Sequence, residues 1–336
     1  MKLRILAAFS LILSTAASGF DGGGRDWIQT LSWFQPALSR VRAAAPLGTS
    51  TNLAPATITA GGGTVNVEFA PGHLEVPSEA VIGWVLAAAR AVTAYYGRFP
   101  VREAHVLIVP VEHRGGVLSG TSWGTRPVFT RIYVGESVDD DQLNNDWIMT
   151  HEMVHYAFPA VAEEHHWIEE GIATYVEPLA RLETGEIGVA KVWGDLIEGL
   201  QFGLPAPGDQ GLDHTHTWGR TYWGGAMFCL LADVTIRRQT KNRYGLRDAL
   251  RAIINAGGNM ETSWPLTRAL RVGDRAVGVP VLMELYNEMK ASPLKPDLPQ
   301  LWRKLGIETD RRPVTFDDTA LWASTRQAIA SGKSDR

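Results

Sequence analysis

The stretch Asp146–Glu177 decides how this chain is interpreted; it reads DWIMTHEMVHYAFPAVAEEHHWIEEGIATYVE. It contains His151 and His155 four residues apart, with Glu152 directly after the first, in the pattern HExxH. Because four residues of α-helix turn about 400°, the two imidazoles lie one above the other on one face and can bind one metal ion. Glu152 lies at the edge of that face, where it can take a proton from a water beside the ion. The pattern therefore predicts a helix that carries a metal site.

A five-residue pattern of this kind also occurs in ordinary amphipathic helices, whose histidines and glutamate face solvent. The metal site is favoured by a third ligand, because a catalytic zinc ion takes three protein ligands and keeps a fourth position open. Glu170 on the next predicted helix is suitable, and Glu177 lies two turns further along the same stripe. Four other candidates lie between the helices: Glu163, Glu164, His165 and His166. We interpret them as a solvated polar turn, because they are too close in sequence to reverse direction and meet the same ion.

The segment WIEEGIATY (167–175) resembles the zinc-ligand helix of the gluzincin metallopeptidases, whose third ligand is a glutamate after HExxH. It matches the Trp-x-x-Glu-Gly-x-Ala-x-Tyr signature of their aminopeptidase N-like branch. The resemblance implies a zincin-like catalytic domain in which Zn2+ is bound by His151, His155 and Glu170. It also implies that Glu177 orients one of the liganding histidines.

A second segment, YWGGA (222–226), resembles the Tyr-x-x-Gly-Ala element of the same branch. The resemblance implies that the Tyr222 hydroxyl stabilises the oxyanion that forms when a carbonyl is attacked. The alternative is a tyrosine that only packs against neighbouring tryptophans. His216 is a further oxyanion candidate, because thermolysin-like relatives use a histidine there, although it is also an ordinary surface residue by composition. Arg220 either contacts a substrate carboxylate or forms a salt bridge.

The chain departs from these relatives in three ways. The connection from His155 to Glu170 is shorter than the aminopeptidase branch usually has. The sixth residue after His155 is Val161, which excludes the metzincins because they require a histidine there. The Gly-x-Met-Glu-Asn segment that holds a substrate's free amino terminus is absent, and the corresponding region, Gly115–Thr125, has no acid. That region is either an edge strand that binds extended peptide backbone or a flexible loop.

Composition excludes several classes of protein. The 336 residues carry a formal net charge of -4 and no basic block, so a nucleic-acid partner is not expected. The single cysteine, Cys229, excludes an intramolecular disulfide, a multi-cysteine zinc site and an iron–sulfur cluster. It lies in an apolar run and is expected to be a buried small side chain.

The first eighteen residues are expected to be a signal peptide. Two basic residues precede the apolar run Ile5–Leu13, which small residues follow, and the run is shorter than a membrane-spanning helix needs. A short membrane anchor is the alternative. We therefore expect a secreted or periplasmic protein with no membrane span after signal cleavage.

Beyond the signal, hydrophobic periodicity predicts an α+β fold with two lobes. The predicted organisation is a linker and lead-in segment at 19–62, a mixed α/β lobe at 63–160 that ends in the HExxH helix, an all-helical lobe at 161–310 and a tail at 311–336. A short helix is possible at 27–38. Strands are predicted at 64–69, 104–111 and 128–134, and helices at 79–96, 141–158, 167–183, 189–200, 222–239 and 246–255.

These observations favour a secreted zinc-dependent metallopeptidase that acts on a peptide or protein substrate. Two alternatives share the residues. One is a catalytically inactive binding protein with the zincin fold. The other is a zinc hydrolase that acts on a non-peptide amide or ester.

Overall fold

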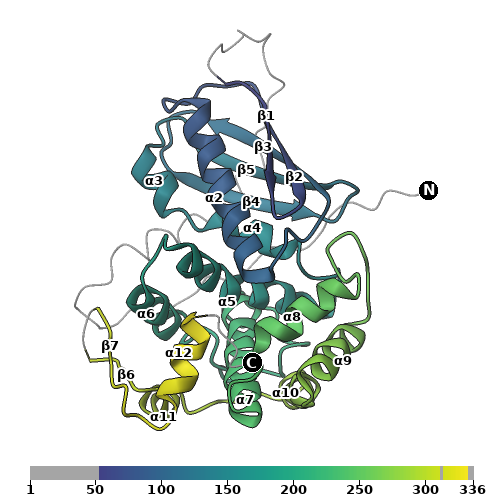
Figure 1. Ribbon diagram of the computed structural model, residues 1–336, viewed down its shortest axis with the longest axis vertical. Coiled ribbons are helices and arrows are strands. Elements are labelled where there is room, and N and C mark those ends of the chain that lie inside the picture. Colours follow the sequence, from purple (N-terminus) through teal and green to yellow (C-terminus); the bar gives the residue numbers. More distant parts are fainter. Residues whose placement is uncertain (1–52, 311–312, 332–336) are drawn as a thin grey trace. The chain divides into compact units, whose positions relative to one another are not determined.

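The computed structural model describes residues 53–310 and 313–331, which lie in one compact unit (Figure 1). Its sheet has five strands: β1 (Ala56–Ala60), β2 (Gly63–Phe69), β3 (Glu103–Val111), β4 (Val117–Trp123) and β5 (Val128–Gly135). Their order is β1-β2-β3-β5-β4. The inner strands β2, β3 and β5 are parallel, while β1 and β4 pair antiparallel at the two edges. Alternate residues such as Val106 and Ile108 are fully buried, as expected for strands with one covered face.

Helix α2 (Ser78–Tyr96) connects β2 to β3 and contacts both the edge strand β1 and helix α4. It ends where Gly97 adopts a left-handed conformation with φ 81°. The chain after the sheet is almost wholly helical. Its helices are α3 (Asp140–Asn145), α4 (Ile148–His155), α5 (His166–Thr184), α6 (Val189–Gly199), α7 (Gly225–Thr240), α8 (Leu246–Asn255), α9 (Leu266–Val277), α10 (Val281–Met289), α11 (Leu298–Leu305) and α12 (Ala323–Ser331). A 3-10 turn, η1 (Glu163–His165), a π-helical turn, η2 (Gly219–Gly224), and a small strand pair, β6 (Ile307–Glu308) with β7 (Thr315–Phe316), complete the described chain.

The predicted mixture of strands and helices is confirmed, but the prediction of one helix over 141–158 is wrong. The chain breaks between α3 and α4 because Asp146 is extended, with ψ 142°. Its carboxylate accepts hydrogen bonds from the backbone N–H of Met149 at 3.0 Å and from Trp84 Nε1 at 3.1 Å. An aspartate whose side chain satisfies a free N–H group favours a new helix start over continuation. The HExxH helix therefore begins independently of α3.

The two regions predicted as a linker and a tail also contain regular structure. Strand β1 lies in the predicted linker, where a short run of alanine and threonine gave a weak signal, and it pairs with β2 through the turn at Gly61 and Gly62. Strand β7 and helix α12 lie in the predicted tail, 311–336. The predicted signal peptide and the possible helix at 27–38 lie outside the described residues.

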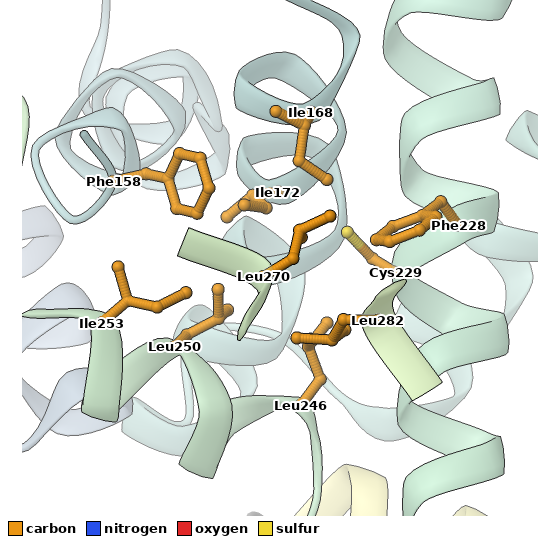
Figure 2. Close-up of a pocket in the computed structure, with 10 residues that line it drawn as sticks. All are labelled: Phe158, Ile168, Ile172, Phe228, Cys229, Leu246, Leu250, Ile253, Leu270 and Leu282. Atoms are coloured by element: carbon orange, nitrogen blue, oxygen red, sulfur yellow. The ribbon is translucent and has the colours of Figure 1, made fainter. Parts of the chain in front are cut away.

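Helix α5 lies at the centre of the helical part and contacts α2, α4, α6 and α7 (Figure 1). Its side chains Trp167, Tyr175 and Val176 are almost completely buried. Figure 2 shows an apolar packing gap beside α5 that is lined by aliphatic and aromatic side chains and by Cys229. The gap is no larger than a single water needs and has no polar lining. Cys229 is buried, as predicted, and burial raises the pKa of its thiol. No described helix has the length and apolar character that crossing a membrane would require.

Candidate active site

Three side chains from α4 and α5 converge on one point. His151 Nε2 lies 3.2 Å and His155 Nε2 lies 3.6 Å from the same carboxylate oxygen, Oε2 of Glu170. All three potential ligand atoms are within 4.8 Å of one another. A tetrahedral zinc ion with bonds of 2.0–2.1 Å holds neighbouring ligand atoms about 3.4 Å apart. The cluster of His151, His155 and Glu170 therefore has the spacing and the donor set that zinc requires.

The packing of α4 and α5 holds this cluster in place. Met149, Met153 and Val154 anchor α4 in the core with no exposed surface. On α5, a Cβ atom at Gly171 would lie 2.3 Å from the backbone carbon of Gly225. Only glycine allows this approach, which brings the start of α7 against the turn of α5 that carries the cluster's carboxylate.

The protonation states of His155 and Glu170 suit metal binding. Burial lowers the pKa of His155 to about 4, so its imidazole is neutral at neutral pH and keeps a free lone pair. Burial alone would raise the pKa of Glu170, but hydrogen bonds with His151 and His166 outweigh it and hold the pKa well below its usual range. Burial would lower the pKa of His151, but its contact with the Glu170 carboxylate outweighs this and raises the pKa. A neutral imidazole beside an ionised carboxylate is the form in which these side chains bind a metal.

Glu152 is buried beside the cluster and is held by the edge strand β4. Ser122 Oγ donates a hydrogen bond of 2.7 Å to Glu152 Oε2. Behind it, Ser122 Oγ lies 2.8 Å from Thr130 Oγ1, which lies 2.6 Å from the Tyr156 hydroxyl. A Cβ at Gly120 would lie 2.6 Å from Glu152 Cγ, so the strand can pass here only because this residue is glycine. Most of the region Gly115–Thr125 is thus an edge strand, β4 (Val117–Trp123), and not a flexible loop, and it touches the candidate base.

Tyr222 reaches the same site from η2. Its ring stacks on that of His151, with centroids 6.1 Å apart and an interplanar angle of 16°. Burial, with Glu170 and Glu152 nearby, raises the pKa of the phenol. A π-helical turn is typical of functional positions. The structure therefore places the Tyr222 phenol beside the cluster, stacked on His151 and close enough to Glu170 and Glu152 for their charges to act on its pKa.

Glu177 lies deep behind the cluster. Arg181 Nη1 donates a hydrogen bond of 3.0 Å to it, and burial raises the pKa of Glu177 to about 7. His151 is near enough to act on that pKa in the opposite direction. Within the described chain, however, the buried Nδ1 of His151 has no hydrogen-bond partner. The structure therefore places Glu177 near His151 without the hydrogen bond that orientation requires.

The two remaining candidates lie away from the cluster. Arg220 is buried, with Nε 2.7 Å from Asp209 Oδ2 and Nη1 donating to the Gly203 carbonyl at 2.5 Å. This is the salt-bridge alternative for Arg220. His216 is exposed, and within the described ranges no hydrogen bond or ring contact joins it to the cluster.

The turn 163–166 is mostly solvated, as predicted, with His165 as the exception. The His165 side chain is mostly buried, with Nδ1 2.9 Å from Asp213 Oδ1. His166 is the first residue of α5, and its Nε2 lies 3.3 Å from Glu170 Oε1. This is the carboxylate oxygen that His151 and His155 do not approach. Because residues 166 and 170 are one helical turn apart, this i,i+4 contact is readable in the sequence. Ser122, by contrast, is thirty residues from Glu152 and leaves no local signal.

Comparison with known proteins identifies a shared fold. No family model matches the chain, and no curated protein matches it in sequence. An aminopeptidase N family protein from Idiomarina loihiensis matches 76% of this chain and 49% of its own, with a TM-score of 0.58 and 14% identity. A two-domain M1 zinc metallopeptidase, solved with bound L-arginine, matches 74% of this chain and 54% of its own, with a TM-score of 0.50 and 18% identity. This chain thus spans about half of each structure, and its fold is similar to that of zinc metallopeptidases.

Proposed function

We propose that the chain is a secreted zinc-dependent hydrolase that cleaves peptide bonds. The observation that carries the proposal is the convergence of three ligand atoms at zinc spacing, with a buried carboxylate and a tyrosine hydroxyl beside them. When bound by His151, His155 and Glu170, zinc supplies a Lewis acid that makes water more acidic and polarises a carbonyl. The export step rests on residues 1–18, which lie outside the described residues.

The chain's own residues account for proton transfer and charge stabilisation. Ser122 holds one oxygen of Glu152, so the carboxylate is oriented to accept a proton from the attacking water and pass it to the leaving amine. The Tyr222 hydroxyl donates a hydrogen bond to the carbonyl oxygen as negative charge develops there. Strand β4 is a sheet edge that contacts Glu152, so an extended peptide can pair with it and bring a backbone carbonyl to this point.

The test combines metal content with cleavage of a mixed peptide library. We expect about one zinc per chain by elemental analysis and cleavage that a chelator abolishes. Glu152→Gln is expected to keep zinc but to cleave at least about a hundredfold more slowly, because the base is lost while the ligands remain. Glu163→Gln, an exposed glutamate in the turn before α5, is the matched control and should match the unchanged protein.

The outcomes separate the alternatives. Zinc without turnover on peptides, amides or esters would indicate a binding protein with the zincin fold. If only a non-peptide amide or ester is hydrolysed, the proposed site is supported and the proposed substrate class is wrong. A protein that has no bound zinc and shows no turnover would overturn the proposal.

A further inference from the structure

Some of the large apolar side chains that remain exposed in the described chain lie in one row with the candidate site. The exposed set is Trp123, Trp147, Val189, Phe202, Trp218, Tyr244 and Leu321. Three of these seven, Trp147, Trp218 and Phe202, belong to a row of ring contacts that includes His151. Single exposed apolar residues need no explanation, but contiguous ones mark a binding surface.

The aromatic row consists of Trp147, His151, Tyr222, Trp218 and Phe202. Neighbouring ring centroids along it are 5.3, 6.1, 6.0 and 5.7 Å apart, each within the range of a ring–ring contact. The row starts at the residue before α4, crosses a candidate zinc ligand and the candidate oxyanion donor, and leaves the site along η2 and the segment after α6.

Exposure increases away from the catalytic centre. Tyr222 is mostly covered, Trp218 is 38% exposed and Phe202 is 53% exposed. Trp218 stacks on Tyr222 at an interplanar angle of 26°. The partly exposed Trp218 ring therefore lies directly against the mostly covered Tyr222 ring. The outer end of the row is therefore an accessible apolar surface that is continuous with the site.

The rings of the row carry no charge of their own. Arg220 is only two residues from Trp218, but its guanidinium is buried and paired with Asp209. The exposed rings therefore offer an apolar surface on which burial of an apolar side chain is favourable.

We propose that the outer part of the aromatic row, Trp218 and Phe202, is the specificity surface for an apolar or aromatic side chain next to the cleaved bond. The inference rests on the proposed function for its catalytic step, because it assumes that the cleaved carbonyl lies between Glu152 and Tyr222. A side chain one residue from that carbonyl then meets the ring stacked on Tyr222.

The test compares two internally quenched peptides that differ in one residue beside the cleaved bond, phenylalanine or glycine. The zinc-loaded protein is expected to cleave the phenylalanine peptide with a kcat/KM at least about tenfold higher. Trp218→Ala is expected to reduce that ratio to within about threefold of unity, and Trp218→Phe to restore most of it. Tyr244→Ala is the matched control, because Tyr244 is also 38% exposed but belongs to no ring contact with the site.

A ratio that stays the same in Trp218→Ala, or a protein that prefers glycine, would overturn the inference. Binding separates this failure from failure of the proposed function. If neither peptide is cleaved, the affinities of zinc-loaded Glu152→Gln for both are measured by calorimetry, alone and combined with Trp218→Ala. Tighter binding of the phenylalanine peptide that depends on Trp218 supports the surface without hydrolysis, and equal binding refutes it.

Discussion

Two buried clusters of charged side chains, one centred on Glu170 of α5 and one on Asp233 of α7, are built in opposite ways. The Asp233 cluster is closed, in the sense that neighbouring donors satisfy both carboxylate oxygens. Its Oδ1 accepts from Arg237 Nε at 2.8 Å and from the Leu246 N–H at 3.0 Å, and its Oδ2 accepts from the Tyr175 hydroxyl at 3.0 Å. A permanent cation and two neutral donors thus satisfy both oxygens.

The Glu170 cluster is open, in the sense that no permanent cation pairs with its carboxylate in the described chain. Imidazole nitrogens, which are neutral or protonated according to their surroundings, face its carboxylate, and no arginine or lysine pairs with it in the described chain. These imidazoles can give up a proton, so a metal cation at the point of convergence can take the place of that proton. The difference separates a cluster whose charges are satisfied within the fold from one that offers ligand atoms to an ion.

Removing the carboxylate from the open cluster is expected to have the largest effect on zinc. Glu170→Ala leaves two imidazoles, so zinc affinity should fall by at least about a hundredfold and hydrolysis should be lost with it. Without metal, its free energy of unfolding should fall, because the low pKa of Glu170 shows that the fold stabilises the ionised carboxylate. The loss should be smaller than for a carboxylate paired with arginine, because the imidazoles left behind can lose their protons. Competition with a chromogenic chelator measures the affinity, and urea unfolding in excess chelator measures the stability.

The matching change in the closed cluster should give the reverse pattern. Asp233→Ala removes the carboxylate that pairs with the buried Arg237, which costs about 3–5 kcal/mol of unfolding free energy, while zinc affinity stays the same. Retention of zinc by Glu170→Ala, with a comparable loss of stability, would show that the two clusters are alike and would remove Glu170 from the ligand set.

A smaller effect, on kcat, is expected from changing the contact between strand β4 and Glu152. Ser122→Ala removes the hydrogen bond to Glu152 Oε2, and bonds to charged groups contribute about 1.5–3 kcal/mol. We expect kcat to fall by at least about tenfold while KM changes little, because the serine positions the base and not the substrate. Ser119→Ala, an exposed serine on the same strand, is the control. If both variants have the same kcat, Ser122 has only a packing role.

How far the sequence predicts these regions depends on how local each feature is. The pairing of His151 with His155 follows from helix geometry alone, and Glu170 from one further helix, so both could be identified before the fold was known. The position of Ser122 follows from the sheet order, which places β4 at the edge beside α4. No periodicity in either segment encodes that contact.

Local patterns also failed where a side chain competes with the backbone. The apolar residues on both sides of Asp146 read as one continuous helix, and the break depends on a carboxylate that bonds Met149 and Trp84 together. The prediction that His165 is solvated failed for a different reason. Polarity predicts exposure, but His165 is buried because Asp213, far along the chain, accepts its hydrogen bond.

Asp146 gives the smallest and sharpest test, because it represents a third way to bury a carboxylate, with hydrogen bonds from neutral donors only. Burial raises its pKa to about 6, above the value of about 4 expected in the unfolded chain. The folded state therefore holds this proton more tightly. The stability it contributes is fully present below about pH 4 and is lost as the pH rises through about 6.

Asp146→Asn keeps an amide oxygen for the same two donors but has no proton to lose. The unfolding free energy of the variant, relative to the unchanged protein, should therefore increase by about 1 kcal/mol between pH 4.5 and pH 7.5, after allowance for the residue's partial exposure. Urea unfolding at both pH values in excess chelator measures this without interference from metal binding. A constant difference would mean that Arg181 and the neighbouring N–H groups hold the charge of Asp146 as firmly as Arg237 holds that of Asp233. In that case Asp146 would belong with the closed cluster, and the cluster of His151, His155 and Glu170 would be the exception in how this chain buries its acids.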